Sequence, residues 1–336
     1  MSGLYDIGVS FFQLPAEEQI ADLTAFAPHI LESYGLRDCV VESINYEYNA
    51  TFRITTPTGE KYALRININS PRTPENTRAE IFWVQRLLEL NIVNLARPIP
   101  NQSGEFLTRI NHAPSGRTLT ALLYSWLEGE ELGDEPSLEQ VKAIGAAMAA
   151  MHAASENFLL PAGASLPTFD DPMWGVEDLL LGAKSVLDPQ SKTVIAAAFA
   201  LINKRIEALY RESAPQIIHA DLHGWNMMWH EGELAIFDFD DCGFGLPIQD
   251  LATAIYYLDT PEQDQAMLDG YLTVRPLPQY TEFEMKSLLL HRRFMLLNYL
   301  YETENQEHQE MIPDYQLETV RRAQVYLAEA SQADIS

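Results

Sequence analysis

Two short stretches in the C-terminal half combine carboxylates, an asparagine and histidines at fixed spacing. The first, His219-Ala-Asp221-Leu-His-Gly-Trp-Asn226, places an Asp five residues before an Asn, and the second, Phe-Asp238-Phe-Asp240, ends an apolar run. Transfer of a phosphoryl group to a hydroxyl needs a carboxylate beside the attacking oxygen, and oxygen ligands that hold a divalent cation against nucleotide phosphates. These residue types at this spacing predict a phosphoryl-transfer centre.

The two stretches are informative because they occur together. Single Asn and Asp residues in loops more often form turns and caps than bind metals. Here the Asp-to-Asn spacing matches the kinase catalytic loop, and Asp238 lies seventeen residues after Asp221, as the Asp of a D-F-G motif would. Strand-like runs at Gln216–Ile218 and Leu234–Phe239 flank the two stretches, which favours the functional interpretation.

A metal-dependent hydrolase is the alternative from another enzyme class. His219-x-Asp221-x-His223 looks like a metal cluster, and Asp238 looks like the nucleophile of a dehalogenase-type phosphatase. Such a phosphatase would carry that Asp on an early strand of a doubly wound sheet and a later Lys, but here only Lys286 follows. The order of the elements argues against the hydrolase.

The elements that must position these residues fall into a β-rich first part and a helical second part. Hydrophobic periodicity and turn signals predict helices and strands in the first part, in the order helix Pro15–Leu36, strands Cys39–Tyr46, Thr51–Thr55 and Tyr62–Ile68 as an antiparallel meander, helix Pro74–Leu90, and strands Phe106–Ile110 and Leu119–Leu127. A helix over Ser137–Ala154, with Ser137 as N-cap, begins the second part.

On these motifs the chain resembles the aminoglycoside phosphotransferase and choline kinase superfamily, which shares the protein-kinase fold. Its Phe237–Ala252 run is most similar to the group of homoserine kinases of type II and a stress-response Ser/Thr kinase. The resemblance implies an α+β, two-lobed fold, with a five-stranded antiparallel sheet plus helix in a nucleotide-binding lobe (residues 1–125) and a mainly helical catalytic and substrate-binding lobe (residues 126–336). It further implies Asp221 as catalytic base, Asn226 and Asp238 as magnesium ligands, and Asp250 as a brace of the catalytic loop.

The N-terminal part should then supply groups that bind ATP. Arg65 stands where kinases carry a Lys on their third strand, and a guanidinium can bridge two phosphate oxygens. Its expected partner is Glu80, fifteen residues further on in the next helix. The first hairpin lacks the glycine-rich loop of protein kinases, so Asn49 is expected to contact the nucleotide, and main-chain groups of Ser125 and Leu127 are expected to hold adenine at the hinge.

Composition limits the partners and the compartment. A net charge of −26 and a pI near 4.5 disfavour nucleic acid and anionic lipid as partners. Two distant cysteines suggest neither a disulfide framework nor a zinc site, and the longest apolar stretch is too short to span a membrane. We therefore expect a soluble, cytoplasmic protein of unknown oligomeric state.

The predicted function is transfer of the γ-phosphoryl group of Mg-ATP to a hydroxyl of a small molecule, such as homoserine, an amino alcohol, an aminoglycoside or a sugar. Only twelve positions separate Asp238 from Asp250, too few for the activation segment of protein kinases. A stress-response type of protein kinase stays open, as does a catalytically silent nucleotide-binding protein, prompted by Arg65 and the missing glycines. The region from Trp174 to Arg292 should line the acceptor pocket. His223 is interpreted as a loop histidine bonded to a backbone carbonyl, with a protonated imidazole that reaches the transferred phosphate as the alternative.

Overall fold

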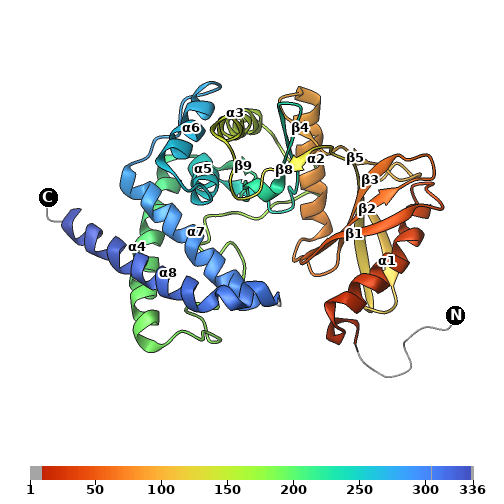
Figure 1. The fold of residues 1–336 in the computed structure, drawn as a ribbon. Coiled ribbons are helices and arrows are strands. Elements are labelled where there is room, and N and C mark those ends of the chain that lie inside the picture. Colours follow the sequence, from red (N-terminus) through yellow and green to blue (C-terminus); the bar gives the residue numbers. More distant parts are fainter. Residues whose placement is uncertain (1–9, 304, 334–336) are drawn as a thin grey trace. The chain divides into compact units, whose positions relative to one another are not determined.

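The computed structural model describes residues 10–303 and 305–333, which form two compact units (Figure 1). The first unit contains the described residues up to Gly129, with Leu159–Ser165 and His230–Asp240. The second contains Glu130–Phe158, Leu166–Trp229 and the described residues from Asp241 onward. The functional boundary expected between residues 125 and 126 stays a prediction.

An antiparallel sheet dominates the first unit. Its strand order is β1-β2-β3-β7-β5, with β6 also paired to β7. The strands are β1 (Val40–Tyr46), β2 (Asn49–Thr55), β3 (Lys61–Asn67), β5 (Pro98–Ile99), β6 (Thr108–His112) and β7 (Arg117–Ser125). The five predicted strands are therefore confirmed, and β5 is an additional one. Sequence patterns missed it because it has two residues and begins with a proline, which cannot donate to a ladder.

Two helices accompany this sheet. In α1 (Ala16–Glu32), the buried residues Leu23, Ala27, Ile30 and Leu31 join a hydrophobic core with the inward face of β2 and β3. A long α-helix, α2 (Pro74–Leu90), has the predicted bounds because the Thr73 hydroxyl caps the amide of Asn76 and a proline occupies its first turn. The same unit pairs β4 (Asn94–Leu95) in parallel with β11 (Glu233–Ile236).

The second unit is mainly helical, as predicted. Its α-helices are α3 (Leu138–Ser155), α4 (Pro189–Glu212), α5 (Pro247–Tyr256), α6 (Pro261–Leu272), α7 (Glu282–Glu302) and α8 (Gln306–Ala333). Its short strands pair as β8 (Glu130–Glu131) with β10 (Met227–His230), and β9 (Gln216–Ile218) with β12 (Gly243–Gly245). Ser137 caps α3 through the amide of Gln140, as expected.

Close backbone packing fixes α3 against α6. A Cβ on Gly145 would lie 2.1 Å from the carbonyl oxygen of Met267, and one on Gly270 would lie 2.0 Å from that of Lys142. No real side-chain atom fits such distances, so both glycines allow the two helices to touch. Among the described residues, no helix has the length and apolar character needed to cross a bilayer.

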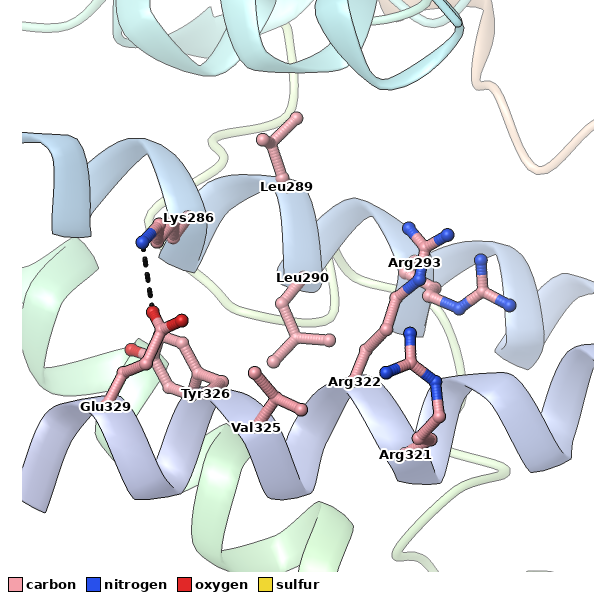
Figure 2. A pocket seen from close by; sticks show the side chains of 9 residues that line it. All are labelled: Lys286, Leu289, Leu290, Arg293, Arg321, Arg322, Val325, Tyr326 and Glu329. Atoms are coloured by element: carbon pink, nitrogen blue, oxygen red, sulfur yellow. Dashed lines mark hydrogen bonds and ion pairs between the residues drawn. The ribbon is translucent and has the colours of Figure 1, made fainter.

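A pocket lies between α7 and α8 (Figure 2). Its charged groups bind one another or neighbouring residues: Lys286 pairs with Glu329 at 3.0 Å, and Arg321 and Arg322 both pair with Glu318. None of the site residues predicted from the sequence lines it. The pocket is therefore a gap in the packing of α7 against α8.

Candidate active site

Asp250 holds the backbone of the loop that follows β9. It lies on α5 with no exposed surface, and its Oδ1 accepts a hydrogen bond from the Ala220 amide at 2.8 Å. Its Oδ2 accepts from the His219 amide at 3.2 Å and from His152 Nε2 at 3.0 Å. Ala220 has a left-handed φ of 69°, which is costly for a residue with a Cβ. Asp250 thus stabilises a strained turn that presents the next residue, Asp221.

The Asp221 carboxylate is surrounded by hydrogen-bond donors. Oδ2 accepts from Asn226 Nδ2 and His223 Nε2, each at 3.2 Å, and Oδ1 accepts from Arg292 Nη2. Burial alone would raise the pKa of Asp221, but the guanidinium of Arg292 and the imidazole of His223 hold that pKa below its usual range. One fifth of the side chain remains exposed, so the carboxylate is ionised, oriented and accessible.

Asn226 uses only one end of its amide inside the protein. Within the described part of the chain, every hydrogen bond of its side chain involves Nδ2, including one to the Asp221 carbonyl at 2.9 Å. Its Oδ1 therefore accepts no hydrogen bond from the described residues. His223 differs from the sequence interpretation: its Nδ1 accepts from the Trp225 amide at 3.3 Å, and its Nε2 lies against the Asp221 carboxylate. The expected bond to a backbone carbonyl was wrong.

Arg292 is the functional neighbour that sequence reasoning missed. It lies on α7, 71 residues after Asp221, and its Nη2 bridges the Asp221 carboxylate and the Tyr257 hydroxyl, the latter at 2.6 Å. Its Cζ lies 5.4 Å from the centre of the Tyr257 ring. The sequence placed Arg292 near the acceptor pocket, but no spacing rule connects it to a loop so far away. The one available signal was that Arg292 is a charged residue in a largely buried helix, a place where charged residues are rare.

A second arginine–carboxylate pair lies in the first unit, where it was predicted. Arg65 on β3 and Glu80 on α2 form an ion pair of 2.5 Å between Nη2 and Oε2, with 8% and 4% of their side chains exposed. The Tyr124 hydroxyl donates to the other Glu80 oxygen at 3.0 Å, and Arg65 lies 5.6 Å from the Tyr124 ring centre. The helix carboxylate therefore fixes the guanidinium in one position, as phosphate binding requires.

The Asp238–Asp240 stretch lies beside this pair. Asp238 Oδ1 is 3.9 Å from Arg65 Nη1, and the residue adopts a left-handed φ of 61° with 43% of its side chain exposed. Asn49 Nδ2 donates to Asp240 Oδ2 at 2.6 Å. Burial would raise the pKa of Asp240, but Arg65 and Asn49 lower it overall. Asp240 thereby connects the β1–β2 hairpin to the acidic stretch.

The residues expected at the hinge are Ser125, the last residue of β7, and Leu127, which lies just beyond the strand. The Ser125 amide donates to the Arg97 carbonyl at 2.8 Å, and its Oγ accepts from the Arg97 amide at 2.9 Å. The Ser125 amide is therefore already engaged. A base bound at this segment would have to use the Ser125 carbonyl or the main chain of Leu127.

The first unit thus brings together Arg65, Glu80, Asn49 and Asp238, and the second brings together Asp221 and Asn226. The described residues contain no group of three or more His, Cys, Asp or Glu side chains arranged to hold a metal. His219, Asp221 and His223 do not form such a group.

Comparison with known proteins identifies the class. The model of the family described as "Phosphotransferase enzyme family" matches residues 44–283, and the chain belongs to that family. The solved structure of a microcompartment-associated aminopropanol kinase superposes with a TM-score of 0.77 at 22% identity, covering 91% of this chain and 98% of the other. An amicoumacin kinase in complex with AMP-PNP, Ca²⁺ and Ami gives 0.74 at 18% identity, covering 92% and 96%. The predicted protein-kinase-like fold is confirmed.

Relatives with curated names agree with that class. The chain is 26% identical over 212 residues to an amicoumacin kinase of Bacillus subtilis (strain 168), an alignment that covers 62% of this chain and 61% of that protein's length. It is 28% identical over 253 residues to a homoserine kinase of Janthinobacterium sp. (strain Marseille), covering 72% and 73%. The predicted relation to the aminoglycoside phosphotransferase superfamily, with homoserine kinases among its relatives, is confirmed.

Proposed function

We propose that the chain transfers the γ-phosphoryl group of Mg-ATP to a hydroxyl of a small molecule. The oxygen of the acceptor hydroxyl would bond to the γ-phosphorus as the bond to ADP breaks, and the hydroxyl proton would pass to Asp221. The observation that carries this proposal is the Asp221 carboxylate, oriented by Asn226 and Arg292 on a loop that Asp250 braces. Relatives named as amicoumacin, homoserine and aminopropanol kinases support a small acceptor.

The remaining predicted residues fit ATP and a divalent cation. Asn226 Oδ1 and the partly exposed Asp238 carboxylate are the kind of oxygen donors that Mg²⁺ takes. Bound there, Mg²⁺ would neutralise charge on the phosphates. Arg65, held by Glu80, would bind phosphate oxygens, while Asn49, Ser125 and Leu127 would contact the nucleotide. The related amicoumacin kinase structure, with AMP-PNP and Ca²⁺, supports nucleotide and metal use.

A protein acceptor is disfavoured by the segment after Asp238. Residues 239–246 contain the three-residue strand β12, which pairs with β9, and α5 begins at Pro247. Such a short connection leaves no activation segment to bind a peptide. We therefore place small hydroxyl compounds ahead of Ser/Thr side chains of proteins.

The test is ADP release from Mg-ATP with pooled hydroxyl metabolites, and separately with a generic protein substrate, followed by mass spectrometry of the product. Asp221→Asn should lower kcat by about 10²–10⁴-fold, the usual contribution of a positioned acid–base group. Asp259→Asn, an exposed carboxylate on the surface, is the matched control and should keep full activity. Nucleotide binding without turnover of any acceptor would support the silent binding protein instead, and activity in Asp221→Asn within tenfold of wild type would exclude the assigned role.

A further inference from the structure

Two consecutive arginines on α7 differ in how their hydrogen-bond donors are used. Arg293 faces α8 (Figure 2), and all three of its nitrogens donate: Nε to Thr319 at 2.9 Å, Nη1 to Tyr256 at 3.2 Å and Nη2 to the Tyr315 carbonyl at 3.2 Å. A hydrogen bond from each of the three nitrogens is the kind of pairing that a buried structural arginine requires.

Arg292 is not paired in this way. Its Nη2 makes both of its hydrogen bonds, to Asp221 and Tyr257, whereas its Nε is buried and has no partner among the described residues. Nη1 donates to none of the described residues either. A buried charged donor without a partner is costly, so an arginine kept in this state points to a ligand that completes its pairing.

The guanidinium is a permanent cation at a fixed place. Burial would lower the pKa of Arg292, but Tyr257 and the carboxylates of Asp221 and Asp241 raise it. The Tyr257 ring, 5.4 Å away, further fixes its orientation. Because Nη2 bonds the carboxylate assigned to the acceptor hydroxyl, any group that the remaining donors bind lies close to that hydroxyl.

A second unpaired donor belongs to the same region. The indole Nε1 of Trp174 is buried without a hydrogen-bond partner in the described part of the chain. Its ring packs against His291, the residue before Arg292, with 5.7 Å between ring centres. Both orphaned groups are N–H donors, and both require an oxygen acceptor.

We propose that Arg292 is a specificity-determining residue that binds a carboxylate of the acceptor, next to the hydroxyl that receives the phosphoryl group. This rests on the proposed function and narrows its acceptors to hydroxy acids and hydroxy amino acids. Planar carboxylates match the donor geometry of a guanidinium, whereas an ammonium group at the same place would be repelled. An amino alcohol or a sugar offers no carboxylate to the donors on Nε and Nη1.

The experiment uses pairs of acceptors that differ only in the carboxylate: L-homoserine with 3-aminopropan-1-ol, L-threonine with 1-aminopropan-2-ol, and L-serine with ethanolamine. The readout is the ratio of kcat/KM for the two members of a pair. Wild type should favour a carboxylated acceptor by at least about tenfold, the value of one charge-assisted hydrogen bond. Arg292→Met should bring the ratio to about one, and Arg292→Lys should lie between the two.

The ratio separates recognition from damage to the catalytic carboxylate, because a disturbed Asp221 slows both members of a pair equally. Arg322→Met is the matched control: it removes a half-exposed arginine that pairs with Glu318 on α8, so the ratio should remain that of wild type. A cooperative melting transition above the assay temperature, measured by differential scanning fluorimetry, would show that Arg292→Met is folded; if it is not, Arg292→Lys provides the comparison.

Three results would overturn the proposal while leaving phosphotransferase activity intact. One is a wild-type ratio of one or below, and another is an undiminished ratio in Arg292→Met. The third is a pooled screen in which every compound that becomes phosphorylated lacks a carboxylate. This includes the case in which only a phosphate-bearing hydroxyl compound, such as glycerol 3-phosphate, is phosphorylated. Absence of transfer to any hydroxyl compound would instead contradict the proposed function itself.

Discussion

The two units each contain a buried arginine, a carboxylate and a tyrosine. The tyrosine hydroxyl bonds the carboxylate in the first unit and the arginine in the second. In the first unit the Tyr124 hydroxyl donates to the carboxylate of Glu80, which is then bonded on both oxygens. In the second unit the Tyr257 hydroxyl accepts from Arg292, and the carboxylate of Asp221 keeps one fifth of its surface exposed. The first arrangement fixes an arginine in place, and the second leaves a carboxylate accessible.

Under the proposed function, this difference separates an arginine–carboxylate pair that positions a group from one that reacts. Glu80 is 3% exposed and can serve only the guanidinium and the phenol that surround it. Asp221 has the same kind of cationic partner, yet it is oriented by Asn226 and remains within reach of a ligand. Loss of the first pair should therefore reduce stability most, whereas loss of the second should reduce activity most.

The largest effect on stability is expected for Arg65→Met. It leaves the Glu80 carboxylate buried without its counter-ion, which typically costs about 3–5 kcal/mol of unfolding free energy. Urea denaturation measures this loss. Arg292→Met should cost less, because Asp221 is more exposed and keeps its bonds from Asn226 and His223.

Two further variants test the cause of that loss. Arg53→Met on β2 breaks an exposed pair with Glu42, whose side chains are 41% and 46% exposed, and should cost at most about 1 kcal/mol. The double variant Arg65→Met, Glu80→Leu should regain most of the stability, since no buried charge remains, but should not regain nucleotide binding. A double variant as unstable as Arg65→Met alone would contradict the explanation.

Much of the first pair could be predicted from the sequence, and little of the second. Arg65 and Glu80 are fifteen residues apart on a strand and the following helix, so local periodicity places both. Capping residues also fix α2 and α3 locally, through Thr73 and Ser137. The bond between Arg292 and Asp221 spans 71 residues and depends on how α7 packs, which no local pattern encodes. The strand β5 was missed for a related reason, because its two residues pair only through β7.

The next largest effect is a pH dependence of stability caused by His291, the neighbour of Arg292 on α7. The pKa of His291 is lowered from 6.5 to about 4, chiefly because the side chain is buried. The nearby Arg292 also lowers this pKa, whereas Asp171 and the hydrogen bond from Nε2 to the Pro172 carbonyl, 2.6 Å long, act in the opposite direction. The unfolded chain therefore takes up a proton more readily than the folded one. The contribution of neutral His291 to the free energy of unfolding is fully present above about pH 6.5. It falls by roughly 3 kcal/mol as the pH drops to about 4.

The measurement is the unfolding free energy of wild type and His291→Gln at several pH values between 7.5 and 4. The difference between the two proteins should shrink by about 1.4 kcal/mol per pH unit below 6.5. His230→Gln replaces an exposed histidine and should leave the pH dependence unchanged. A constant difference between wild type and His291→Gln would show that His291 does not cause the acid sensitivity.

The smallest effects, and the most direct test of the contrast between the units, come from removing each tyrosine hydroxyl. Tyr124→Phe leaves one oxygen of a buried carboxylate unpaired and should cost about 1–3 kcal/mol. Burial raises the pKa of Tyr257 to about 12, so its hydroxyl stays protonated and available to Arg292 at neutral pH. Tyr257→Phe should cost only about 1 kcal/mol, because Arg292 keeps its bond to Asp221 and its position over the ring.

Steady-state kinetics separates the two hydroxyls further. Tyr124→Phe should raise KM for the nucleotide by a few fold, because Arg65 loses rigidity when Glu80 is less firmly held. Tyr257→Phe should instead raise KM for the acceptor and leave KM for the nucleotide unchanged, because Arg292 belongs to the unit that carries Asp221. If both variants altered the same KM, the two arginines would serve one substrate, and the division into a nucleotide-positioning pair and an acceptor-facing pair would be wrong.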